Sequence, residues 1–112
     1  MKSRIPAGYG GGMNDMAKRI KMMQEQIEQK TEELNASTFT SSVGGGVVEA
    51  TVNGKKMLES LIIKPEVVDP EDVDMLQDLI IGAINEAMRK VDDTTEEEMN
   101  KITGGMSIPG LI

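Results

Sequence analysis

Residues 43 to 56 read VGGGVVEATVNGKK, and this stretch is the strongest local indication of how the chain folds. Its central part, residues 47 to 52, alternates between two side-chain faces, as expected of a strand with one face against a core. The face expected to be buried carries Val48, Ala50 and Val52. The glycines at 44 to 46 lack the Gly-Lys-Ser/Thr ending of a phosphate-binding loop, so they predict a flexible or bulged strand entry.

The Asn-Gly pair at residues 53 and 54 follows the alternating segment directly. Both residue types tolerate the positive φ angles of a type I′ turn, which is typical of a two-residue β-hairpin connection. Residues 57 to 63 are again mainly apolar, so the pattern predicts an antiparallel hairpin between 47 to 52 and 57 to 63. Upstream, residues 35 to 42 are polar and β-branched, and they predict a first strand through Thr38, Phe39 and Thr40.

A long helix is predicted nearer the N-terminus, over residues 13 to 34. Its apolar residues recur at alternating spacings of 3 and 4, which is a heptad pattern typical of helix packing. This apolar seam consists of Met13, Met16, Ile20, Met23 and Ile27, and it resumes at Leu34. Lys30 interrupts the seam, so a helix of about six turns is expected rather than a long coiled coil. The glycine-rich residues 1 to 12 are expected to form a flexible tail.

The sequence Asp-Pro-Glu-Asp at residues 69 to 72 is typical of a helix start, with its first Asp as the N-cap and proline at the first helical position. The buried face of this second helix is predicted to carry Val73, Leu76, Ile80, Ala83, Ile84, Ala87 and Val91. A separate short acidic helix is expected over residues 92 to 100, capped by Thr94 or Thr95. Residues 104 to 112 are expected to form a flexible C-terminal tail, which leaves one domain over 13 to 103.

The composition argues against most enzyme classes. The chain contains no Cys and no His, which removes the commonest zinc ligands and the usual general base near neutral pH. The acids at 69 to 74 lack the glycine and closing Glu of a calcium loop, and those at 92 to 98 are more simply a solvated face. We therefore predict no enzyme activity, no catalytic residues, no metal and no cofactor. The least favoured hypothesis is a hydrolase that uses the carboxylates of Glu96, Glu97 and Glu98.

Charge is distributed unevenly along the chain. The whole sequence has a formal net charge of −7, but residues 1 to 24 carry a net +4 and the remaining 88 residues −11. The basic residues of the first segment are Lys2, Arg4, Lys18, Arg19 and Lys21. This separation predicts one surface that contacts an anionic partner while the rest repels it. A single Phe, a single Tyr and no Trp disfavour stacking on single strands, so phosphate contacts to duplex DNA are the better prediction.

The expected core is small for a chain of 112 residues, because it is built from aliphatic side chains and ten adaptable Met residues. A second copy would supply the missing apolar contacts, so a homodimer is expected, with the apolar seam of the first helix helping to build it. The chain has no apolar run of about 18 residues. Its N-terminus also lacks the apolar stretch of a signal peptide, so a cytoplasmic protein without membrane contact is predicted.

Four stretches occur in a characteristic order: MAKRIKMMQEQIEQKTEEL at 16 to 34, the hairpin segment at 43 to 56, DPEDVDMLQDLIIGAINEAMRK at 69 to 90, and the tail TGGM…PG. Together they resemble the YbaB/EbfC family of nucleoid-associated DNA-binding proteins, over about residues 10 to 110. The resemblance implies an α+β fold with a long N-terminal helix, a three-stranded antiparallel sheet, a C-terminal helix and a short extra helix (α-β-β-β-α-α). It also implies an intertwined, tweezer-like homodimer in the cytoplasm and nucleoid.

The leading hypothesis is a homodimer that binds duplex DNA and contributes to nucleoid organisation and gene regulation. Lys18, Arg19 and Lys21 are expected to contact phosphates, helped by Lys2 and Arg4. Two copies of these five basic residues could neutralise about six phosphates, which gives a slope of roughly −5 in log affinity against log salt. The pI of about 4.6 is low for a DNA-binding protein. The alternative is therefore an acidic protein-interaction module linked to replication or recombination proteins.

Overall fold

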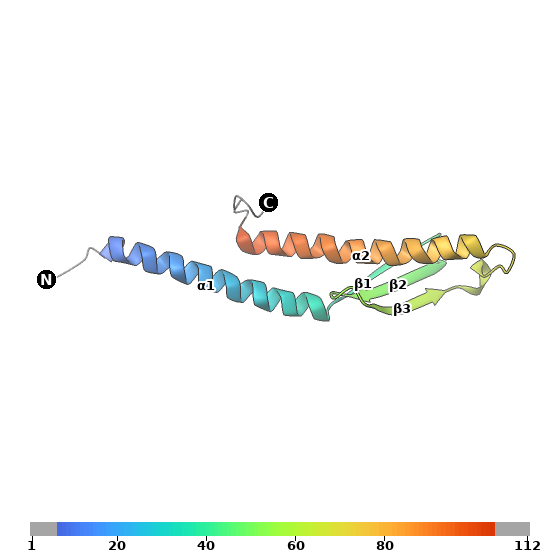
Figure 1. Ribbon diagram of the computed structural model, residues 1–112, viewed down its shortest axis with the longest axis horizontal. Coiled ribbons are helices and arrows are strands. Elements are labelled where there is room, and N and C mark those ends of the chain that lie inside the picture. The colour runs from blue at the N-terminus through green and yellow to red at the C-terminus, as the bar shows by residue number, and fades with distance from the viewer. Residues whose placement is uncertain (1–6, 105–112) are drawn as a thin grey trace.

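The computed structural model of the chain describes residues 7 to 104, with side chains described from residue 14 onward. The elements follow the order α1 (Ala7–Ala36), β1 (Thr38–Val43), β2 (Val48–Asn53), β3 (Leu58–Ile63), the 3-10 turn η1 (Pro65–Val67) and α2 (Val73–Thr103). The two helices run along the long direction of the molecule, and the sheet lies toward one end (Figure 1). The predicted α+β class is confirmed. Within residues 7 to 104 no helix is long and apolar enough to cross a bilayer.

The three strands form an antiparallel sheet in the order β1-β2-β3. Val48 of β2 lies opposite Val43 of β1 and opposite Ile63 of β3, so β2 is the central strand. The predicted buried face is confirmed, because the fully buried side chains of β2 are Val48, Ala50 and Val52. The glycines at 44 to 46 all have positive φ, from 64° to 94°, and they form the turn between β1 and β2.

The turn between β2 and β3 is not the two-residue type I′ turn that the Asn-Gly pair predicted. β2 ends at Asn53 and β3 begins at Leu58, and the residue with positive φ is Lys56, at 63°. The Asn53 side chain holds this longer loop, because its Oδ1 accepts hydrogen bonds from the backbone N–H groups of Lys55 and Met57 at 2.9 and 3.0 Å. The side-chain bonds of Asn53 therefore select a different turn from the one its dipeptide favours.

Gly54 is required in this loop for a reason that the turn prediction did not include. A Cβ atom placed on Gly54 would overlap the carbonyl group of Leu34 and lie 2.8 Å from the Cα of Asn35. The Gly54 N–H also donates to the Ser37 carbonyl at 3.1 Å. The loop thus packs backbone to backbone against the C-terminal end of α1, which only glycine allows.

α2 begins later and ends later than predicted. Its N-cap is Asp72, whose Oδ1 accepts a hydrogen bond from the Met75 N–H at 3.2 Å, so the prediction of the first Asp of the Asp-Pro-Glu-Asp sequence as N-cap was wrong. Asp69 instead accepts from the Glu71 N–H at 2.9 Å, in a turn that precedes the helix. The predicted separate helix over 92 to 100 was also wrong. No Gly or Pro interrupts residues 83 to 103, and α2 continues to its C-cap Gly104, at φ 64°.

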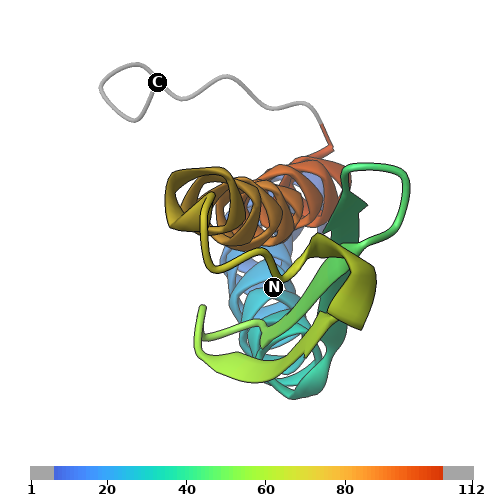
Figure 2. The same ribbon diagram turned by 90° about the vertical axis from the view of Figure 1, so that its right-hand side faces the viewer.

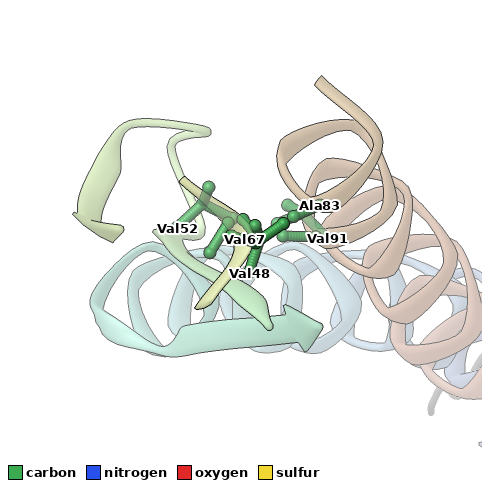
Figure 3. Packing of buried hydrophobic residues seen from close by; sticks show 7 residues of the cluster. Val48, Val52, Val67, Ala83 and Val91 are labelled. Carbon is green, nitrogen blue, oxygen red and sulfur yellow. The ribbon is translucent and has the colours of Figure 1, made fainter. Parts of the chain in front are cut away.

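α2 covers one face of the sheet and forms the core with it. Side chains from β2, η1 and α2 converge there, as Figure 3 shows for Val48, Val52, Val67, Ala83 and Val91. Ala83, Ala87 and Val91 confirm the centre of the predicted helix face, whereas Val73 at its start is 48% exposed. Seen along the molecule, α2 lies against a single side of the sheet (Figure 2). The core is therefore thin, and its largest fully buried side chains are two valines.

α1 begins at Ala7, so residues 7 to 12, which were expected to belong to a tail, are part of the helix. Once a long helix is formed, each added residue gains a backbone hydrogen bond without a new nucleation cost, which offsets the low helix propensity of glycine. Residues 1 to 6 and 105 to 112 lie outside the described residues. The predicted flexible tails at those ends, and the domain boundaries drawn from them, stay predictions.

Candidate nucleic-acid interface

The apolar seam of α1 changes its surroundings along the helix. Leu34 is buried and Met23 and Ile27 are half-buried, whereas Met16 and Ile20 are 65% and 52% exposed. Figure 1 shows the cause: α2 runs beside the C-terminal part of α1, and the N-terminal part extends beyond it. Among residues 7 to 104, the first half of α1 therefore stands away from the other elements.

The predicted basic residues lie on this projecting half. Lys18, Arg19 and Lys21, which we call the basic head, are all exposed. At about 100° per residue, Lys18 lies opposite the apolar seam, Lys21 lies to one side of it, and Arg19 flanks it on the other. None of the three forms an ion pair with any side chain among residues 14 to 104. Their charges thus spread over about 160° of the helix circumference, a little less than half of it.

Two of the predicted site residues, Lys2 and Arg4, lie outside the described residues, so the structure brings together three of the five. The remaining length of α1 has the opposite charge, with acids on the same exposed surfaces at Glu25, Glu28, Glu32 and Glu33. A polyanion is attracted to the projecting end of α1 and repelled from its base. The charge distribution therefore places the basic head at one end of α1 and a mainly acidic surface along the rest of the helix.

The acidic segment of α2 has a structural use that the sequence did not reveal. Asp92 pairs with Lys56 of the β2–β3 loop at 2.5 Å. Glu98 pairs with Lys30 of α1 at 3.3 Å and with Lys101 of α2 at 3.0 Å. The prediction of a merely solvated acidic face was incomplete, because these two carboxylates join α2 to the hairpin and to α1. Periodicity alone could not identify the partners, which are distant in sequence.

Carboxylates in the described part of the chain do not gather into a metal site. Among residues 14 to 104 no group of three or more His, Cys, Asp or Glu side chains is placed to hold a metal ion. A hollow beside α1 is lined by side chains of that helix alone, between Met22 and Glu32. The feature that distinguishes this surface is its charge, with a cationic end of α1 on an otherwise acidic protein.

A known protein family matches most of this chain. The sequence pattern of the YbaB/EbfC DNA-binding family matches residues 10–106. The chain belongs to the YbaB/EbfC family. Its family resemblance, first noted from four sequence stretches, is thereby confirmed over most of the chain, and its family is one of DNA-binding, nucleoid-associated proteins rather than a class of enzymes.

Nucleoid-associated proteins of other bacteria resemble this chain along almost their full length. A nucleoid-associated protein of Clostridium acetobutylicum is 51% identical over 110 residues, which cover 98% of each chain. Another, from Clostridium perfringens strain SM101, is 52% identical over 107 residues, covering 96% of this chain and 95% of the relative. An uncharacterised protein of Helicobacter pylori has a similar structure, with a TM-score of 0.57, 26% identity, and coverage of 70% of this chain and 90% of that one.

Proposed function

We propose that this protein binds duplex DNA as a homodimer, through the basic heads of its two α1 helices. The observation that carries the proposal is the exposed cluster of Lys18, Arg19 and Lys21 on a helix end that projects from an acidic protein. Two heads on one dimer double the positive charge that a single chain presents to phosphates. The site of action is the bacterial nucleoid in the cytoplasm, where the protein contributes to nucleoid organisation and gene regulation.

The thin core supports the dimer in this proposal. Several large apolar side chains near β3 and the first half of α2 stay exposed in the single chain: Leu58, Ile62, Val68, Val73, Met75 and Ile81. A three-stranded sheet covered by one helix is marginal by itself, and a second copy would bury these side chains. The dimer therefore accounts for apolar surface that a monomer would leave in water.

The edge of β3 is the better candidate for the dimer contact. The edge of β1 is already in contact with α2, because Lys90 donates a hydrogen bond to the Thr40 carbonyl at 2.6 Å. At about 100° per residue, Ile81 lies on the flank of α2 opposite Lys90, above the β3 side of the sheet. The β3 edge has strand pairing on one side alone, so its free backbone groups and the exposed Leu58 are available to a second copy.

We expect Ile81→Lys to convert the dimer to a monomer in light scattering at micromolar concentration. A charge at a buried interface position costs several kcal/mol, whereas the same change costs little at a site exposed in the monomer. The matched control is Asp93→Lys, which places the same residue at an exposed position on a different face of α2. A dimer that persists with Ile81→Lys would show that this flank of α2 is not the contact.

DNA binding is tested by fluorescence anisotropy with a short labelled duplex and the same sequence as a single strand. The proposal predicts that the duplex binds more tightly, because the basic head offers point charges and no aromatic stacking surface. Affinity purification from nuclease-treated cells adds a second comparison. Capture of a stable protein partner, together with no measurable duplex binding by the pure protein, would replace this proposal with the protein-interaction alternative.

A further inference from the structure

Lys30 occupies the one position where the apolar seam of α1 is interrupted, and the structure shows what it contacts. Its Nζ lies 3.3 Å from Oε1 of Glu98 on α2 and 3.1 Å from Oε1 of Glu33 on its own helix. The other carboxylate oxygen of Glu98, Oε2, accepts a hydrogen bond from Lys101 at 3.0 Å. Glu98 therefore bridges one cation from each helix, and we call Lys30, Glu98 and Lys101 the helix clasp.

The helix clasp is a directional contact at a place where the other contacts are not directional. The seam residues on either side of it, Ile27 and Leu34, are half-buried and buried apolar side chains, which allow small rotations and shifts. A polar pair within an apolar seam, in contrast, specifies the register of two helices. We therefore expect the clasp to restrict the tilt of α1 relative to α2 more than the apolar side chains beside it do.

The position of the clasp near the base of α1 means that a small tilt there displaces the basic head by a larger distance. α1 meets the hairpin at its C-terminal end, where the Gly54 backbone packs against Leu34, and this contact forms the pivot. With a rise of about 1.5 Å per residue, Lys30 lies roughly 6 Å from the pivot and the basic head roughly 20–24 Å from it. A tilt that moves Lys30 by 1 Å would move the head by about 3–4 Å.

We propose that Lys30 and Glu98 are positioning residues, which set the direction of α1 and thereby the separation of the two basic heads along bound DNA. This inference rests on the proposed function and goes beyond it, because it assigns the spacing of DNA contacts to residues that touch no DNA. Loss of the clasp leaves every basic residue of the head in place. What changes is how far apart two copies hold them.

The clasp is ionised across the neutral range. Hydrogen bonds from Lys101 and from Lys30 lower the pKa of the Glu98 carboxyl, and hydrogen bonds to Glu33 and Glu98 raise the pKa of the Lys30 ammonium. A lowered carboxyl pKa means that the contribution of Glu98 is complete above its ordinary value of 4.5 and is lost as the pH falls below it. The position of α1 should therefore be independent of pH between about 6 and 8.

The absence of cysteine makes a direct distance measurement simple. Spin labels at Gln24→Cys on α1 and Glu96→Cys on α2, both exposed positions, report the angle between the helices. Labelled chains are diluted with unlabelled protein, so that each dimer contains at most one labelled chain. We expect Glu98→Gln and Lys30→Gln to broaden the distance distribution and to shift its mean by about 2–5 Å, since the labels lie nearer the pivot than the head does.

Two matched variants isolate the clasp from a general charge effect. Glu97→Gln removes the neighbouring acid, whose nearest cation is Lys101 of the same helix at 4.0 Å, and should leave the distribution unchanged. Lys30→Arg retains the positive charge and should also leave it unchanged. A distribution for Glu98→Gln that matches the unchanged protein would overturn the inference, as would an equal change with Glu97→Gln.

A second measurement links the clasp to DNA. A duplex labelled at both ends reports bending by energy transfer at saturating protein, and Glu98→Gln should alter the transfer while the salt dependence of binding stays the same. Altered helix distances with unaltered DNA geometry would contradict the positioning role. If the unchanged protein binds no DNA, the proposed function fails, whereas the label distances still show whether the clasp directs α1.

Discussion

Changing Lys18, Arg19 and Lys21 together to glutamate is expected to weaken binding to a short duplex at least about 100-fold at 50 mM salt. In a dimer the change replaces six cations of the basic heads by six anions, on helix ends that already stand on an acidic body. Each lost phosphate contact also removes a counterion release, so the slope of log affinity against log salt should become much less steep. Fluorescence anisotropy measures both effects. All three positions are exposed, so folding should be unaffected.

The matched control reverses three other exposed cations, Lys55, Lys64 and Arg89, to glutamate. The net charge of the chain changes by the same amount in both variants, so a general repulsion between an acidic protein and DNA would weaken binding equally. The proposed interface predicts that the control retains most of the affinity. Equal losses of affinity in the two variants would show that the basic head is not the DNA contact.

Gly54→Ala is expected to cause the largest loss of stability, about 2–4 kcal/mol. The new methyl group would overlap the Leu34 carbonyl, and the group in its way is helix backbone rather than a flexible side chain. Relief requires the β2–β3 loop to move away from the end of α1, which also breaks the Gly54 to Ser37 hydrogen bond. Thermal unfolding followed by circular dichroism, at one fixed protein concentration, would show the loss as a midpoint lower by roughly 10–20 °C.

Gly82→Ala serves as the comparison because the opposite sign is expected. A Cβ on Gly82 would make ordinary contact with Val43, at 3.9 Å, within the interior of α2. Alanine is the better helix residue, so this variant should gain about 0.5–1 kcal/mol. A similar loss in both variants would mean that the packing of Gly54 against α1 is not what limits substitution there.

The fold was predictable where one period dominates the sequence. The alternation in β2 and the spacing of Ala83, Ala87 and Val91 both reflect burial against a single neighbour, and both predictions were confirmed. The predictions of the helix N-cap and of the β2–β3 turn were wrong because a second residue or hydrogen bond nearby favoured another local structure. Asp69 and Asp72 are both good N-caps, but in the structure Asp69 holds the preceding turn and Asp72 caps the helix. The Asn-Gly pair favoured one turn, while side-chain hydrogen bonds from Asn53 stabilised another.

The candidate site also has features that the sequence predicted and features that only the structure shows. The basic residues could be found from the sequence because a net charge of +4 in 24 residues needs no knowledge of the fold. Exposure of the basic head followed from the structure, since it depends on where α2 ends beside α1. The role of Lys30 was not predictable, because its partner Glu98 lies 68 positions away in the sequence. In the sequence Lys30 is an interruption of a seam, whereas in the structure it forms an ion pair with Glu98 of α2.

A salt titration shows whether the basic heads of a homodimer bind DNA phosphates, because each phosphate contact releases counterions. Affinity of the unchanged dimer for a short duplex should be measured between about 50 and 200 mM salt. About six neutralised phosphates predict a slope of roughly −5 in log affinity against log salt, which is a loss of about a thousandfold across this range. An affinity that is the same at both ends of the titration would show that contacts between the basic heads and phosphates do not hold the DNA.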